Sequence, residues 1–375
     1  MRAFAVARAV RGIEPLVAAE IKKLGVVRRL RHREVWFEAP EPGPDLLGLR
    51  TADDVLLVAA VVDGVGPGRA ALERLRRAAE GADAGTALRL RRTAAPPGGR
   101  GRPVEARTAS RASGDGRRPV EVSATFVGRR SYSRFDVEDA VGAGLSRALG
   151  VPYHSRAGGV APPPGAVPWR VTIEDDQAVI AVRLGDRPLH RRPYKEDSIP
   201  GTLHPPLAAA MVALTGLADP GRDHHGRGAG QVVLDPCCGA GTTLAEAGLL
   251  LPRARLVGVD HSPASVRAAA ANARRAGVAL TPVVGDAGRL PLPSGSVDRV
   301  LVNPPWGRQV AAAGLLARDG GLLWREVRRV LAPGGLVVAL TGDVPDGFRV
   351  ERAIEVSLSG RHPVLTVLRP ARRRR

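Results

Sequence analysis

One pattern recurs through the C-terminal part of this chain: a short apolar run, then a turn, then a helical stretch. The apolar runs are 232–235, 256–260, 282–285, 299–303 and 335–341, and the helical stretches between them include 242–251, 263–276 and 322–331. Strands joined through helices pair in parallel, because a parallel neighbour needs a long crossover connection. We therefore expect a doubly wound α/β domain over residues 231–370. Two alternating runs, 352–358 and 364–368, would form an antiparallel pair at its sheet edge.

The residues before this domain lack the repeat and are typical of smaller α+β units. Segments rich in proline and glycine separate these units, at 94–119, 157–168 and 218–230. We expect strands at 4–10, 35–37, 54–62, 120–126, 169–174 and 178–184, and helices at 14–24, 46–50, 69–79, 137–149 and 201–214. The expected domains are an α+β unit at 1–65, a second at 66–188, a linker with a helix at 189–230, the doubly wound domain at 231–370 and a basic tail at 371–375.

Composition excludes several classes of protein. No uninterrupted apolar run exceeds eight residues, whereas a helix that crosses a bilayer needs ~20. Arg2, Arg8 and Arg11 interrupt the N-terminus, which therefore lacks the continuous apolar core of a secretory signal. The two cysteines, Cys237 and Cys238, are adjacent and match no zinc-binding spacing. We expect a cytoplasmic protein with no membrane partner and no metal.

The charge of the chain predicts a polyanionic partner. Lys and Arg number 56 against 37 Asp and Glu, so the formal net charge is +19. Residues 86–134 carry 12 arginines and only Glu105, Asp115 and Glu121, a local net charge of +9. Such clustering is typical of a phosphate-binding surface, and a disordered arginine-rich linker would have the same composition.

The strongest motif joins the first strand of the repeat to its first helix. It reads DPCCGAGT at 235–242, and its two glycines allow backbone to approach a ligand closely at the carboxyl end of the sheet. Asp260 ends the next strand, where a carboxylate can accept both ribose hydroxyls, and Asp286 closes the third strand near an adenine amino group. The cofactor contacts expected here are Asp235, Pro236, Gly239, Gly241, Thr242, Asp260, Asp286 and Ala287.

A dinucleotide-binding domain of the dehydrogenase kind is the alternative explanation of this motif. However, the turn lacks a third glycine at the expected spacing, and Asp235 suits a cationic ligand better than a pyrophosphate. The ligand that combines ribose, adenine, a sulfonium and an ammonium is S-adenosylmethionine. The motif therefore predicts a methyltransferase cofactor site.

The fourth strand ends in the sequence NPPWG at 303–307, which suits methyl transfer to an exocyclic amine. That reaction requires the nitrogen lone pair to be freed from ring conjugation and aimed at the methyl group. The Asn303 side-chain oxygen and the Pro304 carbonyl can each accept one amine hydrogen, Pro305 helps to make the loop rigid, and Trp306 can stack on the base. These four residues are the expected catalytic set.

The two motifs together resemble those of amino-directed RNA methyltransferases, specifically the THUMP-domain guanine-N2 branch. The resemblance extends upstream: 12–16 and 49–53 resemble the N-terminal ferredoxin-like domain of that branch, 126–134 and 136–140 its THUMP segment, and 191–194 and 200–205 the stretch that leads into the catalytic domain. The chain departs from the family at Trp306, where Tyr or Phe is more usual, and in the insertions at 94–119 and 157–168.

The resemblance implies a ferredoxin-like domain at 1–65, a THUMP RNA-binding domain at 66–188 and a class I, Rossmann-like methyltransferase domain at 231–370. It also implies that Gly201, Thr202 and Leu203 contact the methionine part of S-adenosylmethionine, and that residues 303–306 hold a guanine. The expected reaction is methylation of guanine N2 in RNA, with tRNA the preferred substrate. Alternatives are a guanine of 23S rRNA, an adenine amine in RNA or DNA, and a non-catalytic RNA-binding protein.

An enzyme of this kind must present one base to a buried pocket and needs a second surface that reads RNA shape. Arg129, Arg130 and Arg134 are the candidates for that surface. Tyr132 lies among them and could stack on a base or serve the fold instead. Because the chain has only 12 aromatic residues, contacts to the RNA backbone should dominate binding.

Overall fold

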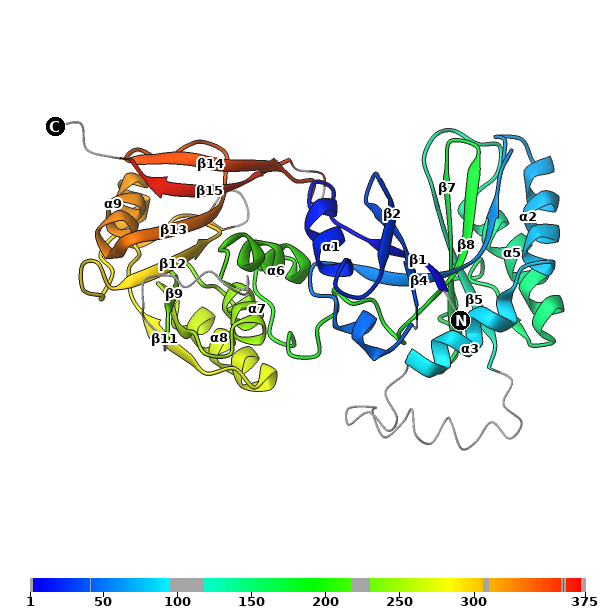
Figure 1. Cartoon of the computed structure of the whole chain (residues 1–375), viewed down its shortest axis with the longest axis horizontal. Helices are drawn as coiled ribbons and strands as arrows, with labels where there is room; N and C mark the ends of the chain where they lie inside the picture. The colour runs from blue at the N-terminus through cyan, green and yellow to red at the C-terminus, as the bar shows by residue number, and fades with distance from the viewer. Residues whose placement is uncertain are drawn as a thin grey trace. The chain divides into compact units, whose positions relative to one another are not determined.

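The computed structural model describes residues 3–40, 42–94, 118–217, 230–305, 310–358, 360 and 362–371. The chain divides into two compact units (Figure 1). Unit 1 comprises Met1–Arg8, Ala18–Leu49 and Asp53–Leu189, and unit 2 comprises Ala9–Val17, Arg50–Ala52 and His190–Arg375. None of the described helices is long and apolar enough to cross a membrane.

Unit 1 is built on a sheet in which eight described strands pair in the order β2-β3-β1-β4-β8-β7-β5-β6. The strands are β1 (Ala3–Arg8), β2 (Val26–Arg31), β3 (Glu34–Ala39), β4 (Asp54–Val62), β5 (Val120–Phe126), β6 (Tyr153–His154), β7 (Val167–Glu174) and β8 (Gln177–Arg183). The antiparallel pair β4 and β8 joins strands from 1–65 to strands from 66–188 in one continuous sheet. The domain boundary expected between residues 65 and 66 thus stays a prediction.

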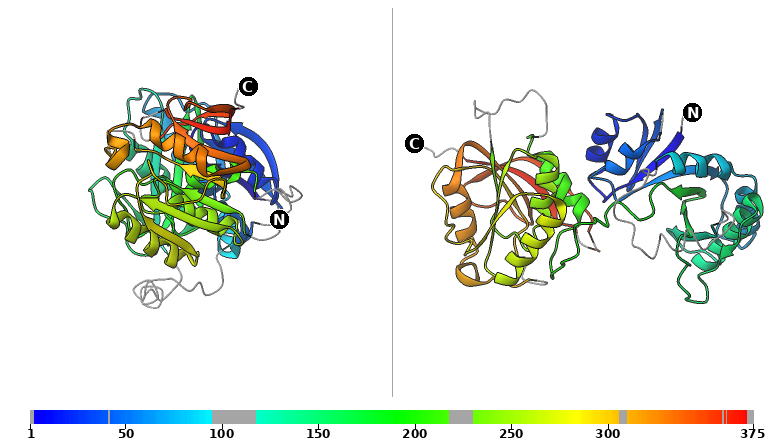
Figure 2. Two further views of the ribbon diagram at one scale, coloured as in Figure 1. Left: turned by 90° about the vertical axis from the view of Figure 1, so that its left-hand side faces the viewer. Right: turned by 90° about the horizontal axis from the view of Figure 1, so that it is seen from below.

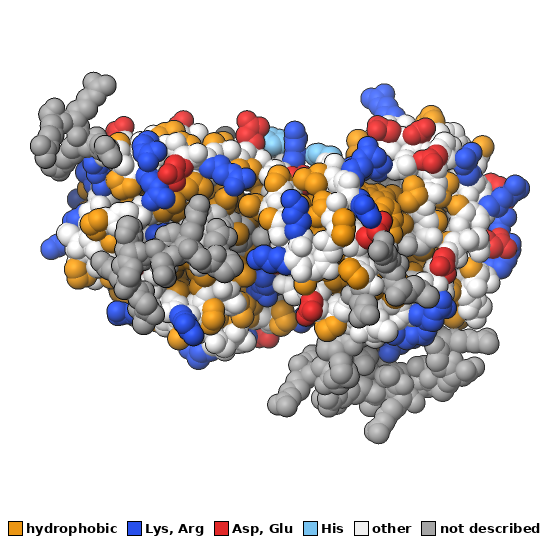
Figure 3. Space-filling model, in the orientation of Figure 1, with side chains coloured by type: hydrophobic (Ala, Val, Ile, Leu, Met, Phe, Trp, Pro, Cys, Tyr) orange, Lys and Arg blue, Asp and Glu red, His pale blue; other side chains and the backbone are white. Residues whose placement is uncertain are grey.

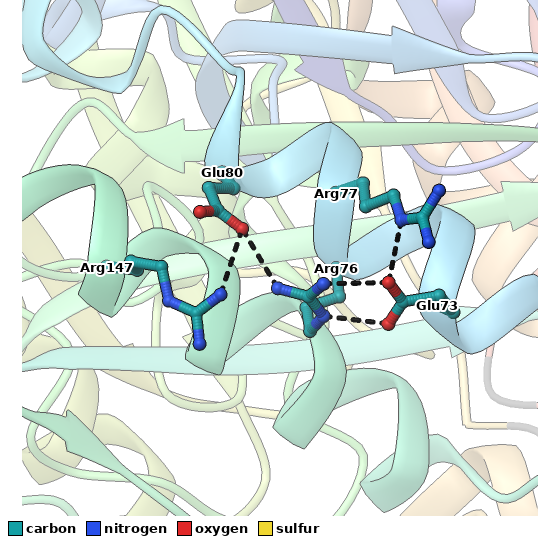
Figure 4. A network of polar contacts seen from close by, with 5 residues as sticks. All are labelled: Glu73, Arg76, Arg77, Glu80 and Arg147. Carbon is teal, nitrogen blue, oxygen red and sulfur yellow. Dashed lines mark hydrogen bonds and ion pairs between the residues drawn. The ribbon is translucent and has the colours of Figure 1, made fainter.

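The helices of this part of the chain are α1 (Glu14–Ile21), the 3-10 helix η1 (Pro44–Gly48), α2 (Ala70–Glu80), α3 (Ala84–Ala94) and α5 (Arg134–Leu149). Helices α2 and α5 pack closely because α5 carries Gly144, where an added Cβ would lie 2.3 Å from the Arg76 carbonyl oxygen. A polar network also links their surfaces (Figure 4): Glu80 accepts from both Arg76 and Arg147. Arg76 and Arg77 hold the pKa of Glu73 down at about 2.

Unit 2 is a doubly wound domain whose seven described strands pair in the order β11-β10-β9-β12-β13-β15-β14. The strands are β9 (Val232–Asp235), β10 (Arg255–Asp260), β11 (Leu280–Val284), β12 (Val297–Val302), β13 (Leu331–Thr341), β14 (Phe348–Glu355) and β15 (Val364–Pro370). β9 to β13 are parallel, and β15 pairs antiparallel with both β13 and β14. The expected α/β fold and the antiparallel pair at the sheet edge are confirmed.

Helices cover both faces of this sheet (Figure 2). They are α6 (Pro205–Leu214), α7 (Thr242–Leu250), α8 (Pro263–Ala276), the 3-10 helix η2 (Gly314–Ala317) and α9 (Gly321–Val330). Helix α9 lies on one face, where Leu323 and Val327 pack into an apolar cluster with residues of β12 and β13. Helices α6, α7 and α8 lie on the other face. Burying such apolar side chains stabilises the domain by roughly 1.5–3 kcal/mol for each large one.

Several boundaries differ from the sequence-based expectation for identifiable reasons. α5 begins at Arg134, three residues early, because Ser133 and Asp136 form a reciprocal capping box. The helix expected at 201–214 begins only at Pro205, since two prolines occupy its first positions and His204 is extended. Strand β2 and helix α3 were not expected, because their arginine-rich sequences show no clear apolar period.

Candidate active site

A cavity of about 790 Å³ opens at the carboxyl ends of the unit 2 strands. Ligands of open α/β sheets bind at this edge. The expected site residues that line it are Gly201, Thr202, Leu203, Asp235, Pro236, Gly239, Thr242, Asp260, Asp286, Ala287, Asn303, Pro304 and Pro305. Gly241 is not among the described residues of its wall. Trp306 lies outside the described residues.

The glycines of the DPCCGAGT turn shape the entry into α7. Gly239 and Gly241 both have left-handed backbones, with φ of +52° and +74°. A Cβ at Gly241 would lie 2.9 Å from the Ala269 Cβ, so this glycine allows the turn to approach α8. Its role is therefore to shape the backbone of the turn rather than to form part of the cavity wall.

Three carboxylates reach the cavity from three neighbouring strands. Asp235 ends β9 and Asp260 ends β10, while Asp286 follows β11. Burial raises the pKa of Asp235 to about 7, although the Thr243 hydroxyl and the Cys237 backbone N–H both donate to it. A carboxylate that is costly to ionise alone is stabilised by a cationic ligand. The site thus favours a cation next to Asp235.

Backbone N–H groups fix the other two carboxylates. Asp260 accepts hydrogen bonds from the Gly239 N–H and the Ser262 N–H, both at 2.9 Å. Asp286 accepts from the Gly288 and Leu315 N–H groups, both at 2.8 Å. Each carboxylate oxygen has a second lone pair. Asp260 can therefore still accept ribose hydroxyls and Asp286 an adenine amine, as expected from their strand positions.

Asn303 follows β12, the strand that pairs with β9, so it lies at the same edge as the three carboxylates. Its Nδ2 donates to the Gly201 carbonyl oxygen at 3.5 Å. This contact directs the amide nitrogen to the segment before α6, which leaves Oδ1 as the atom with the chemistry to accept an amine hydrogen. The sequence reasoning placed Gly201 and Asn303 in one site, and the structure brings them together.

A buried ionic network connects the segment before α6 to helix α7. Glu246 is 0% exposed and accepts from Arg192 Nε at 2.9 Å, from Tyr194 Oη at 2.7 Å and from Arg50 Nε at 2.8 Å. Burial and the Glu246 charge raise the pKa of Tyr194, which keeps its hydroxyl a donor. None of these residues was expected in a functional role from the sequence.

Two further polar side chains, those of Thr242 and Lys195, line the cavity. The Thr242 hydroxyl is buried at the start of α7 and has no hydrogen-bond partner within the described residues. Lys195 also lines the cavity and, unlike Thr242, was not expected there from the sequence. One signal could have identified it: Lys195 directly follows the 191–194 stretch and is one of only three lysines in the chain. An orphaned buried hydroxyl and three carboxylates fit a polar, cationic ligand such as S-adenosylmethionine.

The four RNA-binding candidates in unit 1 differ in their exposure. Arg129 and Arg134 are exposed. Arg130 instead donates to the Val65 carbonyl oxygen at 2.9 Å and to the Asp175 carbonyl oxygen at 2.6 Å. Tyr132 is 4% exposed, and its hydroxyl donates to the Gly66 carbonyl oxygen. Of the two roles considered for Tyr132, this burial favours the structural one over stacking on a base.

Comparisons with known proteins find related methyltransferases. The RMKL-like methyltransferase domain family matches residues 192–348. The tRNA (guanine(6)-N2)-methyltransferase of Thermus thermophilus is 32% identical over 269 residues, 68% of this chain and 73% of that enzyme. The U6 snRNA (guanine-N(2))-methyltransferase THUMPD2 of Bos taurus is 31% identical over 175 residues, 46% of this chain and 32% of that protein.

A solved structure is also similar to this chain. The crystal structure of TrmN from Thermus thermophilus matches with a TM-score of 0.71 and 27% identity, covering 99% of this chain and 100% of that one. The alignment to the Thermus tRNA methyltransferase spans more residues than the catalytic match alone, so the relationship reaches beyond the cofactor domain. The chain therefore belongs to the family of S-adenosylmethionine-dependent RNA guanine-N2 methyltransferases.

Proposed function

We propose that the RNA substrate of this enzyme is tRNA and that guanine 6 is the modified nucleotide. The observation that carries the proposal is the extent of similarity to the Thermus tRNA (guanine(6)-N2)-methyltransferase, 68% of this chain. Substrate choice among RNA enzymes depends on the surfaces outside the cofactor domain. A relative aligned over more than the catalytic domain is thus a better guide to substrate than one aligned over that domain alone. A tRNA-modifying enzyme would work in the cytoplasm.

S-adenosylmethionine supplies an electrophilic methyl group. The task of the protein is to make guanine N2 a nucleophile, because its lone pair is delocalised into the ring. In our proposal the Asn303 Oδ1 and the Pro304 carbonyl oxygen accept the two N2 hydrogens and turn the lone pair out of conjugation. The Asn303–Gly201 contact holds the amide in the required orientation. Positioning and hydrogen bonding thus provide the catalysis.

RNA recognition is assigned in this proposal to unit 1, with residues 1–65 as a ferredoxin-like domain and residues 66–188 as a THUMP domain. Arg129 and Arg134 remain the candidates for phosphate contacts because both are exposed. The target guanine must leave its stack to reach the cavity, which costs a few kcal/mol. Contacts distant from the target base can offset this cost.

The test is methyl transfer from labelled S-adenosylmethionine to separate pools of tRNA, rRNA and DNA, followed by nucleoside digestion. We expect N2-methylguanosine from tRNA only. A tRNA transcript with adenine in place of guanine 6 should accept no methyl group, whereas the unaltered transcript should accept one. Labelled rRNA or methyladenosine would contradict the proposal. Absence of product from every pool would favour a non-catalytic RNA-binding protein.

A double variant tests the RNA surface. Arg129→Ala with Arg134→Ala should weaken tRNA binding and lower the slope of log affinity against log salt by about 1 for each phosphate that the protein no longer neutralises. Affinity for the cofactor should not change. The matched control is Arg77→Ala on α2, since that exposed arginine is paired with Glu73. Equal tRNA affinity of the double variant and the control would remove both arginines from the interface.

A further inference from the structure

Lys195 is the one Lys or Arg among the described residues that line the unit 2 cavity. Its Nζ donates to the Leu203 carbonyl oxygen at 2.9 Å, and Leu203 also lines the cavity. An ammonium group has three hydrogens to donate. Burial lowers the pKa of Lys195, which indicates that the protein alone does not fully compensate its charge.

Two sets of interactions place Lys195 beside the first turn of α7. Tyr194, the residue before Lys195, donates to Glu246 at 2.7 Å, and Glu246 is four residues after Thr242 on the same helix. Residues four apart lie on one face of a helix. The Asn272 amide also donates to the carbonyl oxygens of Asp197 and Ala240, so the chain just after Lys195 lies against the turn just before Thr242.

The charges around the cavity indicate which part of the cofactor Lys195 and Thr242 can bind. The described wall of the cavity holds Asp235, Asp260 and Asp286, all of which suit the cationic or hydrogen-donating parts of S-adenosylmethionine. The methionine carboxylate of the cofactor has the opposite requirement, because three nearby carboxylates repel it. It needs a cation and hydroxyl or N–H donors. The start of a helix also favours an anion.

We propose that Lys195 Nζ and Thr242 Oγ1 bind the carboxylate of the methionine part of S-adenosylmethionine. The Thr242 hydroxyl, which has no partner among the described residues, gains an acceptor. The Lys195 ammonium gains a counter-ion and keeps its bond to Leu203. The subsite makes the enzyme selective for a cofactor that carries a carboxylate, and it does so independently of the RNA substrate.

The test compares two ligands that differ only in this group, S-adenosylmethionine and decarboxylated S-adenosylmethionine, by calorimetry without RNA. Lys195→Met keeps the bulk of the side chain and removes the charge. We expect it to weaken binding of S-adenosylmethionine by about 10- to 100-fold, the range for hydrogen bonds to charged groups. Binding of the decarboxylated ligand should change less than about 3-fold, because that ligand makes no contact with the subsite.

Three further variants keep the result interpretable. Lys195→Arg should retain most of the preference for the carboxylate. Asp260→Ala should weaken the binding of both ligands to the same extent, because the proposed partner of Asp260 is the ribose that both ligands carry. Lys23→Ala removes an exposed lysine of unit 1 and should not change the binding of either ligand.

An equal loss for both ligands in Lys195→Met would show a merely structural role and overturn the proposal. Unchanged binding of both ligands would overturn it as well. If Lys195→Met does not fold, Thr242→Val provides the test alone, because it removes only the orphaned hydroxyl. A selective loss of S-adenosylmethionine in that variant supports the subsite, and the absence of a selective loss refutes it.

Discussion

Asn303→Ala is expected to lower kcat for methyl transfer by about 10²- to 10³-fold or more while leaving cofactor affinity within about 3-fold, the loss typical of one catalytic hydrogen-bonding group. The reason is that Asn303 acts on the acceptor amine rather than on the cofactor. Asn303 is the residue directly after β12. The three cavity carboxylates, Asp235, Asp260 and Asp286, belong to β9, β10 and the turn after β11. Single-turnover rates and calorimetry measure the two quantities separately.

Asn303→Asp separates the two functions of the amide. The aspartate retains an oxygen that can accept an amine hydrogen but loses the Nδ2 donor to the Gly201 carbonyl oxygen. It should therefore keep more activity than the alanine variant and less than the native enzyme. Equal kcat in the alanine variant and the native protein would refute the proposed activation of guanine N2.

Much of this site could be predicted because its residues follow from strand position. Asp235, Asp260 and Asn303 come at or directly after the carboxyl ends of apolar runs, and parallel strands bring those ends to one edge. Lys195 and Glu246 could not be found in this way. Lys195 belongs to an irregular segment, and Glu246 reads as a polar residue on an ordinary helix until Arg50 and Arg192 are packed against it.

The arginine-rich part of unit 1 illustrates a second limit of sequence reasoning. The net charge of 86–134 does not distinguish arginines that support the fold from those that face solvent. Arg91 is 9% exposed and donates to the Arg183 carbonyl oxygen and to Asp186, and Arg130 is likewise held by backbone carbonyls. Residues 95–117 lie outside the described part. On the face seen in Figure 3, Lys and Arg side chains are spread out rather than gathered in one stripe.

The largest effect on stability is expected from Glu246→Ala. This change leaves the guanidinium groups of Arg50 and Arg192 facing each other without their shared carboxylate. Arg192 is almost fully buried, with a side-chain exposure of 4%. Breaking a buried ion pair by removing one partner costs about 3–5 kcal/mol. Glu246→Gln preserves the volume and some acceptors but not the charge, so it should fall between the native protein and Glu246→Ala.

The loss should be local to unit 2, because Arg50, Arg192, Tyr194 and Glu246 all belong to that unit. Hydrogen exchange read by mass spectrometry should show faster exchange in α6 and α7, while the amides of α2 and α5 in unit 1 keep their protection. The matched control is Glu80→Ala in the exposed network of Figure 4, where solvent screens the pairs with Arg76 and Arg147. Equal protection in Glu246→Ala and Glu80→Ala would mean that the buried network does not stabilise unit 2. Selective loss of protection in α6 and α7 would instead show that one buried carboxylate holds the cofactor-lining segment 195–204 against the helix that begins at Thr242.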